Sequence, residues 1–203
     1  MNSILQTSRS DNDDKCVYNA IENRVVISML PKRSAGEIQC NDVPVQKYRR
    51  DDYKPVCFIR AVPNSAVMVC QSMTVIDTEA DTEGIPTRQF SSTTWLCEKV
   101  GKVKLVPLEQ FDASVMLAGG SMTMMALPLK GVLDGAVALG LTKRDVLAFS
   151  AQMLKGMAEL LEDGTSPAEL SESMSNQWNY MTRKLSNLEK KGIRVAFAEA
   201  MTD

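Results

Sequence analysis

The chain has 203 residues, of which 44% are hydrophobic and 24% charged, and its net charge is -2. This balance is that of a soluble globular protein with one large or two small domains, and it gives no reason to expect a nucleic-acid partner. The sequence contains no histidine, which excludes histidine-based catalytic triads and histidine metal sites. Its five cysteines have no C-x-x-C spacing, so we expect neither a disulfide framework nor a metal site.

The first segment, residues 1–22, is polar and charged and is predicted to be a tail. It lacks the basic and apolar regions of a signal peptide, so we expect the protein in the cytoplasm. No apolar run in the sequence approaches the roughly 20 residues that cross a bilayer, so no membrane partner is expected.

Residues 23–107 have the short β-branched runs of an α/β region. Strands are predicted where such runs are bounded by proline, glycine and acidic residues. The segment 66–70 is predicted to be either a third short strand or a packed loop, and a helix is predicted around residues 94–97. The predicted strands are Arg24–Leu30, Pro55–Arg60, Met73–Ile76 and Val103–Val106.

Residues 108–203 have helical periodicity. Apolar side chains recur at helical spacing up to Gly140, and a second apolar stripe runs from Val146 to Leu161. Between them, Thr142 and Asp145 have the spacing of a capping box, which marks the start of the second helix. We therefore predict two long helices, largely buried, joined by a tight corner at residues 140–142.

This helical region resembles the C-terminal dimerisation domain of pyrroline-5-carboxylate reductase, an enzyme of proline synthesis. Upstream, the segment Ile59–Ser65 (IRAVPNS) resembles the R-x-M-P-N-T-P segment of the same family. The matching positions in the helical region are Phe111-Asp112-Ala113, Leu117, Gly119, Asp134-Gly135, Val137, Gly140-Leu141, Arg144, Ala151-Gln152, Gly156, Pro167, Leu170, Ser175, Leu185, Leu188-Glu189, Gly192, Arg194 and Ala200.

The resemblance implies a fold of two parts: a truncated, Rossmann-like α/β remnant at residues 23–107 and an all-α dimerisation domain at residues 108–203. Helices of two subunits interlock in this family, so a homodimer is expected. In the family the first part binds a dinucleotide through a glycine-rich turn. The 203 residues contain no G-x-G-x-x-G, and we therefore expect no cofactor.

The resemblance also implies where a small-molecule substrate would bind. The family's S-G-S-G-P-A-Y segment corresponds to residues 118–124, and its S-P-G-G-T-T segment corresponds to residues 175–182, where both glycines are replaced by larger residues. We expect a helix to begin at Ser121–Thr123 and to offer free N–H groups to a carbonyl or carboxylate oxygen. The pocket is then either filled or reshaped for a larger, more apolar ligand. Its predicted lining is Asn64, Ser121, Thr123, Met124, Trp178, Asn179 and Thr182, with plain packing as the alternative for Trp178.

Three functions are compatible with these features. The first is a non-redox, cofactor-independent cyclase or isomerase, pericyclase-like, that uses the apolar cavity in specialised or secondary metabolism. The second is an NAD(P)H-dependent imine reductase of the pyrroline-5-carboxylate reductase type. The third is a non-catalytic binding or scaffold dimer. We rank them in this order, and the sequence identifies no catalytic residue for any of them.

Overall fold

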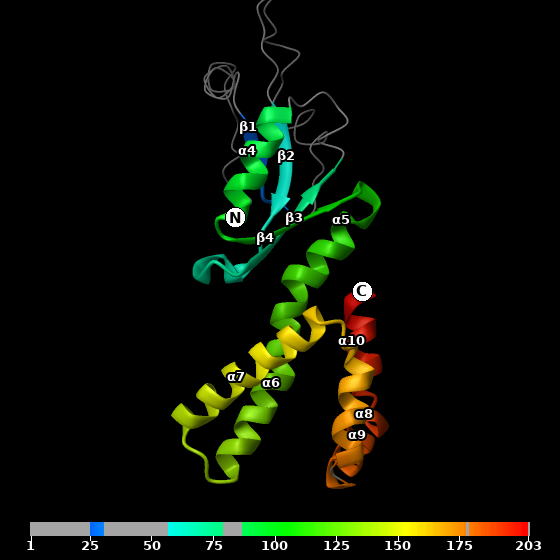
Figure 1. Cartoon of the computed structure of the whole chain (residues 1–203). Coiled ribbons are helices and arrows are strands. Elements are labelled where there is room, and N and C mark those ends of the chain that lie inside the picture. The colour runs from blue at the N-terminus through cyan, green and yellow to red at the C-terminus, as the bar shows by residue number, and fades with distance from the viewer. Residues whose placement is uncertain (1–24, 31–56, 79–86, 178, 203) are drawn as a thin grey trace, which may run out of the picture. The chain divides into compact units, whose positions relative to one another are not determined.

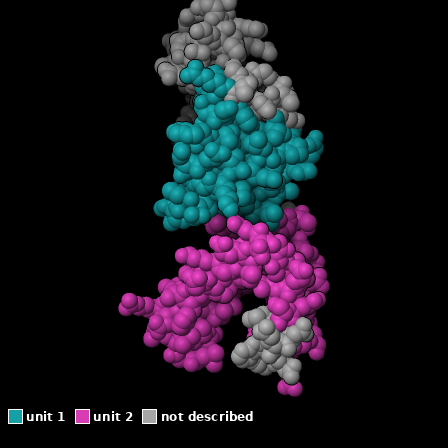
Figure 2. All heavy atoms as spheres, in the orientation of Figure 1, with its two compact units in different colours: residues 1–120 teal, residues 121–203 magenta. Residues whose placement is uncertain are grey.

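The computed structural model describes residues 25–30, 57–78, 87–177 and 179–202. The predictions for the N-terminal tail and for the loops within residues 31–56 and 79–86 lie outside these ranges. The chain divides into two compact units, residues 1–120 and residues 121–203, which are coloured separately in Figure 2. The predicted boundary lay after residue 107, and the difference arises because the next helix packs on the sheet of the first unit.

The first unit contains a four-stranded mixed sheet with the strand order β1-β2-β3-β4 (Figure 1). Strands β1 and β2 are parallel, β2 and β3 are antiparallel, and β3 and β4 are parallel. All four predicted strands are therefore confirmed, and the fold class of a small sheet followed by helices is confirmed with them. The strand bounds are β1 Val25–Ser28, β2 Cys57–Val62, β3 Ser72–Asp77 and β4 Gly101–Val106.

The sheet has a hydrophobic core on each face because neighbouring residues of a strand point to opposite sides. On one face, Ile76 of β3 packs with Ile59 of β2 and with Phe90 of helix α4 (Thr87–Glu98). On the other face, Val75 packs with Phe111 of helix α5 (Leu108–Val115). The two helices thus cover opposite faces of the sheet, which accounts for the nearly complete burial of β3.

A single glycine allows β4 to begin beside β3. Gly101 has a φ of +151°, and a Cβ placed there would lie 2.0 Å from the backbone oxygen of Ser72. No other residue type fits this close approach without moving the strand. Farther along β4, Lys102 and Lys104 are exposed, and charged side chains of this kind discourage edge-to-edge strand pairing.

The segment 66–70 forms neither of the two predicted structures. It lies in a 3₁₀ helix, η2 (Ser65–Val69), which ends at Cys70 in the left-handed region with a φ of 54°. The helix forms because Asn64 caps its first turn, so local side-chain chemistry decides the structure against the β-branched composition.

The second unit consists of five helices among the residues that the structure describes. Helix α6 packs against α7, α8 packs against α9, and α9 packs against α10 (Figure 1). The two predicted long helices are confirmed as α6 and α7. The bounds are α6 Ser121–Ala138, α7 Lys143–Glu162, α8 Pro167–Gln177, α9 Asn179–Lys190 and α10 Ile193–Thr202.

The corner between α6 and α7 forms as predicted. Gly140 has a φ of 98°, which closes the first helix. The Thr142 hydroxyl accepts a hydrogen bond of 3.2 Å from the Asp145 amide and donates one of 2.7 Å to the Asp145 carboxylate. A second capping box, which the sequence analysis did not identify, starts α8. There the amide of Ser166 donates to Glu169, and the amide of Glu169 donates to the Ser166 hydroxyl.

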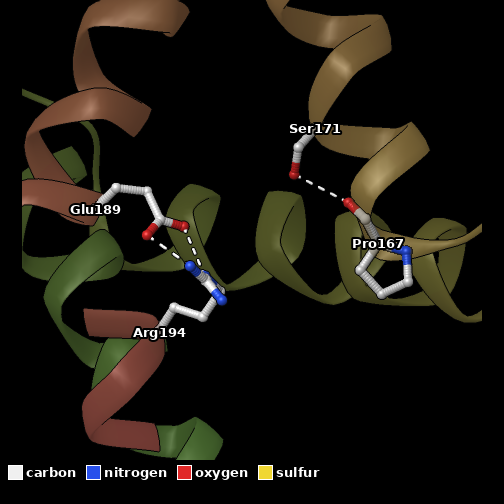
Figure 3. A network of polar contacts seen from close by, with 4 residues as sticks. All are labelled: Pro167, Ser171, Glu189 and Arg194. Carbon is white, nitrogen blue, oxygen red and sulfur yellow. Dashed lines mark hydrogen bonds and ion pairs between the residues drawn. The ribbon is translucent and has the colours of Figure 1, made fainter. Parts of the chain in front are cut away.

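Polar contacts hold the last helices at their ends. Figure 3 shows Arg194, near the start of α10, donating to both carboxylate oxygens of Glu189, near the end of α9, over 3.2 and 3.4 Å. Between them Gly192 turns the chain with a φ of 69°. In the same figure, the Ser171 hydroxyl donates to the carbonyl of Pro167 within the first turns of α8. The ion pair therefore bridges the turn between two helices.

The prediction that the two long helices are largely buried is wrong for the single chain. In α7 only Val146 is buried, and in α6 no residue is. The sequence pattern identified apolar faces correctly, but the residues that the structure describes do not cover them. Side chains left exposed on α6, α7 and the corner between them include Met125, Leu127, Val132, Leu139, Leu147, Phe149, Leu154 and Leu161.

One helical run is long and apolar enough to cross a membrane. It extends over Leu108–Ala138 and has a mean hydropathy of 1.3 in its most apolar window. Length and composition alone are weak support for a membrane span, because the same properties occur in helices that pack against protein. The first part of this run, α5, packs on the sheet through the fully buried Phe111.

Candidate functional site

The turn after β2 is held by Asn64. Its side-chain Oδ1 accepts a hydrogen bond of 3.1 Å from the amide of Ala66, which caps η2. Its own backbone amide donates to the hydroxyl of Ser72 over 3.0 Å. Asn64 was predicted to line a pocket. In the structure its hydrogen bonds stabilise the turn.

The same side chain reaches a segment far away in the sequence. The Nδ2 of Asn64 donates a hydrogen bond of 2.8 Å to the carbonyl oxygen of Ala118. A Cβ added at Gly119 would lie 3.9 Å from the Cβ of Asn64, so a side chain there would just touch that of Asn64. The structure therefore brings together the two segments of the first unit that the resemblance assigned to the substrate.

A buried arginine joins the IRAVPNS segment to α5, farther up the same helical run. The guanidinium of Arg60 lies over the ring of Phe111, 3.9 Å from its centroid, and donates to the carboxylate of Asp112 over 2.9 Å. The Arg60 side chain is 4% exposed, and a buried charge of this kind needs a partner to offset its lost hydration. Arg60 belongs to the IRAVPNS segment and the other two residues belong to the dimerisation-domain match. The contacts between them fix β2 to α5.

The helix between α5 and α6 contains a π-turn, η3, over Met116–Gly120. Such turns are rare and often lie at functional sites. The expectation of a free helix start at Ser121 is wrong, because the chain is helical without a break over Leu108–Ala138. The first amides of α6 thus follow directly on the π-turn, so the predicted row of open N–H groups does not exist there.

Two glycines lie at the end of this π-turn. Each costs a regular helix about 1 kcal/mol relative to alanine, so the α-helix is locally weak here. A Cβ at Gly120 would lie 2.4 Å from the sulfur of Met116, whose side chain is partly exposed and able to move. Gly119 and Gly120 are both half-buried, and at Gly119 the backbone is accessible because no side chain lies close over it.

The remaining predicted site residues belong to the second unit. On α6, Ser121 and Met124 are half-buried and Thr123 is exposed; on α9, Thr182 is exposed. Trp178 and the side chain of Asn179 lie outside the described residues. We predicted that these residues line a pocket, and this stays a prediction.

The second unit has a hollow that the sequence analysis did not identify. It measures about 190 Å³ and lies between α6 and α7. Its walls are mostly apolar, and none of the predicted site residues lines it. Nearby, Lys130 and Asp134, four residues apart on α6, form an ion pair of 2.7 Å in solvent. The lining residues are Leu133, Asp134, Val137, Lys143, Val146 and Leu147.

The described residues do not favour a cysteine nucleophile or a metal site. Burial raises the pKa of the Cys97 thiol, and the neighbouring Glu98 carboxylate raises it further, so this thiol is a poor nucleophile near neutral pH. Within the described ranges, no group of three or more acidic or cysteine side chains is placed to hold a metal ion.

A dinucleotide does not fit the described residues. Such a cofactor needs a glycine-rich turn from a strand into a helix, where backbone amides meet the pyrophosphate. After β1, Leu30 donates its amide to the hydroxyl of Ser28 over 3.4 Å, and no strand–glycine–helix turn occurs in the part of the chain that the structure describes. We therefore assign no chemical step to a nicotinamide cofactor.

Comparison with known proteins decides the family. The family model for pyrroline-5-carboxylate reductase dimerisation matches residues 109–203. The chain is 34% identical over 191 residues to the pyrroline-5-carboxylate reductase of Lophium arboricola and 33% identical over 145 residues to that of Neurospora crassa. Residues 109–203 form the dimerisation domain of the pyrroline-5-carboxylate reductase family.

The match covers most of this chain but only part of its relatives. The two alignments cover 92% and 71% of this chain, but 58% and 43% of the fungal reductases. The chain therefore spans about half the length of the curated relatives it matches.

Solved structures of the family have the same fold. A Plasmodium falciparum pyrroline carboxylate reductase with NADP bound matches with a TM-score of 0.73 at 14% identity, over 94% of this chain and 72% of that one. A Streptococcus pyogenes 1-pyrroline-5-carboxylate reductase matches with a TM-score of 0.71 at 19% identity, over 95% and 70% of the two chains. These likenesses support the family fold, and the substrate-side residues of this chain are assigned from its own contacts.

Proposed function

We propose that this chain is the dimerisation and substrate-side part of an imine reductase of the pyrroline-5-carboxylate reductase type. Its ligand would be a small cyclic imine that carries a carboxylate. One observation carries the proposal: Asn64 of the IRAVPNS turn donates to Ala118, at the entrance of the glycine pair that corresponds to the family's substrate segment. The relatives are named as reductases, which favours this function over the cyclase or isomerase that we ranked first.

The first glycine of the pair leaves room for a small ligand. Gly119 has no side chain between its backbone and an approaching ligand, so a small carboxylate or imine can come close to the peptide group there. The contact between Asn64 and Ala118 holds this stretch in one shape before a ligand arrives, which lowers the entropy cost of binding.

The second family signature differs here in a way that affects the ligand. Where relatives have two glycines, this chain has Trp178 and Asn179. Large residues at these positions leave less room for a carboxylate to reach the backbone, so we expect weaker binding of pyrroline-5-carboxylate than a site with both glycines would give. A larger, more apolar imine is the second ligand class to test.

The proposal includes a homodimer formed by the helical unit. The apolar faces of α6 and α7 are exposed in one chain, and exposed apolar surface of this extent is typical of an interface. Figure 2 shows the second unit hollowed between its two groups of helices, which leaves room for elements of a partner. The family model that matches residues 109–203 describes the dimerisation domain of pyrroline-5-carboxylate reductase.

The proposal is tested by recording amide resonances while pyrroline-5-carboxylate is added to the purified chain. Shifts at Gly119 and Gly120 that saturate are expected, with smaller shifts when proline, the reduced product, is used. If resonances at the glycine pair do not move, the chain does not bind this ligand and the proposal is wrong.

A further inference from the structure

We infer that Asn64 is a positioning residue that keeps the π-turn Met116–Gly120 in its π form. The π-turn lies within a run that is otherwise α-helical, and it ends at the boundary of the two compact units. A π-turn shifts carbonyl groups out of the regular i to i−4 ladder, so a donor from outside the helix can stabilise it. Asn64 supplies such a donor to the carbonyl of Ala118, within this turn.

Asn64 is itself held firmly enough to do this. Its side chain accepts from the Ala66 amide while its backbone amide donates to the hydroxyl of Ser72, which is 2% exposed. The bond from Ala66 fixes the position of the carboxamide, and its Nδ2 donates to the helix. The donor is therefore part of a rigid turn and does not depend on a flexible surface side chain.

The π-turn has a reason to need support. It ends in a Gly119–Gly120 pair, and glycine gives the helix backbone more freedom than any other residue. Within the turn, the side chain of Met116 occupies the space that a Cβ at Gly120 would take. Without the Asn64 donor, this stretch would relax to a regular α-turn or fray, and the accessible backbone at the glycine pair would change shape.

The consequence for ligand binding rests on the proposed function, but the structural inference does not. An Asn64→Asp variant isolates the bond, because aspartate can still accept from the Ala66 amide and cap η2 but its carboxylate cannot donate to Ala118. A Ser72→Ala variant is the matched control, since it removes a bond to the same residue and leaves the Nδ2 donor in place.

The experiment is backbone hydrogen exchange of the full chain. We expect Asn64→Asp to speed exchange at residues 116–123 by about tenfold and to leave exchange in β3 and α7 unchanged. Ser72→Ala should change exchange at residues 116–123 by less than about twofold. The inference is overturned if Asn64→Asp leaves these residues unchanged, or if Ser72→Ala speeds them equally.

A second variant covers the case in which Asn64→Asp does not fold, as judged by circular dichroism. Asn64→Ser keeps a short capping oxygen but cannot span to Ala118, and the same acceleration is expected. Adding pyrroline-5-carboxylate to the wild type then separates the two claims. Exchange that responds to Asn64→Asp without any ligand shift supports the positioning role and counts against the proposed function. Ligand-induced shifts at the glycine pair, without faster exchange in Asn64→Asp, would support the proposed function and count against the positioning role.

Discussion

Arg60 is buried and Asp112 is exposed, yet the guanidinium of one donates to the carboxylate of the other over 2.9 Å. The pair joins β2 to α5, and the ring of Phe111 supports the guanidinium from its face. The carboxylate is thus an exposed partner for a charge that has lost most of its water. Removing Arg60 and removing Asp112 should therefore lower the free energy of unfolding by different amounts.

Replacing Asp112 by alanine should lower the free energy of unfolding by about 1 kcal/mol, because the buried guanidinium loses one charged acceptor. Arg60→Ala should cost more, since it also empties the space over Phe111. Arg60→Met keeps most of that volume without the charge and should be milder than Arg60→Ala. Urea unfolding measures all three, and equal losses for Arg60→Met and Arg60→Ala would contradict the packing role.

The dimer can be tested at Gly135 on α6. In the single chain a Cβ added there meets nothing within 4 Å, so a larger side chain has room and should leave the subunit fold intact. If the glycine marks a close contact between subunits, Gly135→Leu should dissociate the dimer by blocking that approach. Gly135→Ala is the control, and it should raise helix stability by up to about 1 kcal/mol.

Sedimentation at low micromolar concentration measures the oligomeric state directly. The wild-type chain should sediment as a dimer of its 22.4 kDa subunit. A stable, folded monomer in the wild type would contradict the account of the exposed apolar helices. A dimer that persists in Gly135→Leu would place the close contact elsewhere on α6 or α7.

The start of α8 should respond to acid. The hydrogen bonds from Ser166 lower the pKa of Glu169 from its ordinary value of 4.5. The folded state therefore binds this proton less readily than the unfolded state, and the capping box contributes its full stability above pH 4.5. That contribution is lost as the pH falls through the lowered pKa. Amide exchange at the first turn of α8 should rise in acid, and Glu169→Gln should weaken this response.

The 203-residue chain should bind NADH and NADPH poorly. The prediction rests on the absence of a G-x-G-x-x-G motif from the sequence. Calorimetric titration with either nucleotide checks it, and low-micromolar binding would contradict it. With weak binding, the hydride donor of an imine reductase would have to be held by residues other than these.

The parts of the fold that local chemistry decides could be predicted from the sequence. The cap of Thr142 and Asp145 joins residues within one helical turn, and it forms as expected. The strands followed from their β-branched composition. The 3₁₀ helix did not, because the cap by Asn64 outweighs the composition of residues 65–69.

The candidate site was harder to predict because its decisive contact is not local. Asn64 and Ala118 are 54 residues apart, and no periodicity in the sequence connects them. The π-turn was missed because a pattern search assumes a regular helical repeat, and a new helix was expected to begin at Ser121–Thr123. The role of Trp178 stays a prediction.

The central claim is that this chain binds a cyclic imine carboxylate at the turn that Asn64 holds. The most direct test is calorimetric titration of the dimer with pyrroline-5-carboxylate and with 1-pyrroline, which has the same ring without the carboxylate. The account predicts saturable binding of pyrroline-5-carboxylate, much weaker binding of 1-pyrroline, and a loss of affinity of about tenfold in Asn64→Asp. The account would be contradicted if neither compound binds. It would also be contradicted if the wild type binds both compounds equally well and Asn64→Asp binds them with the same affinity as the wild type.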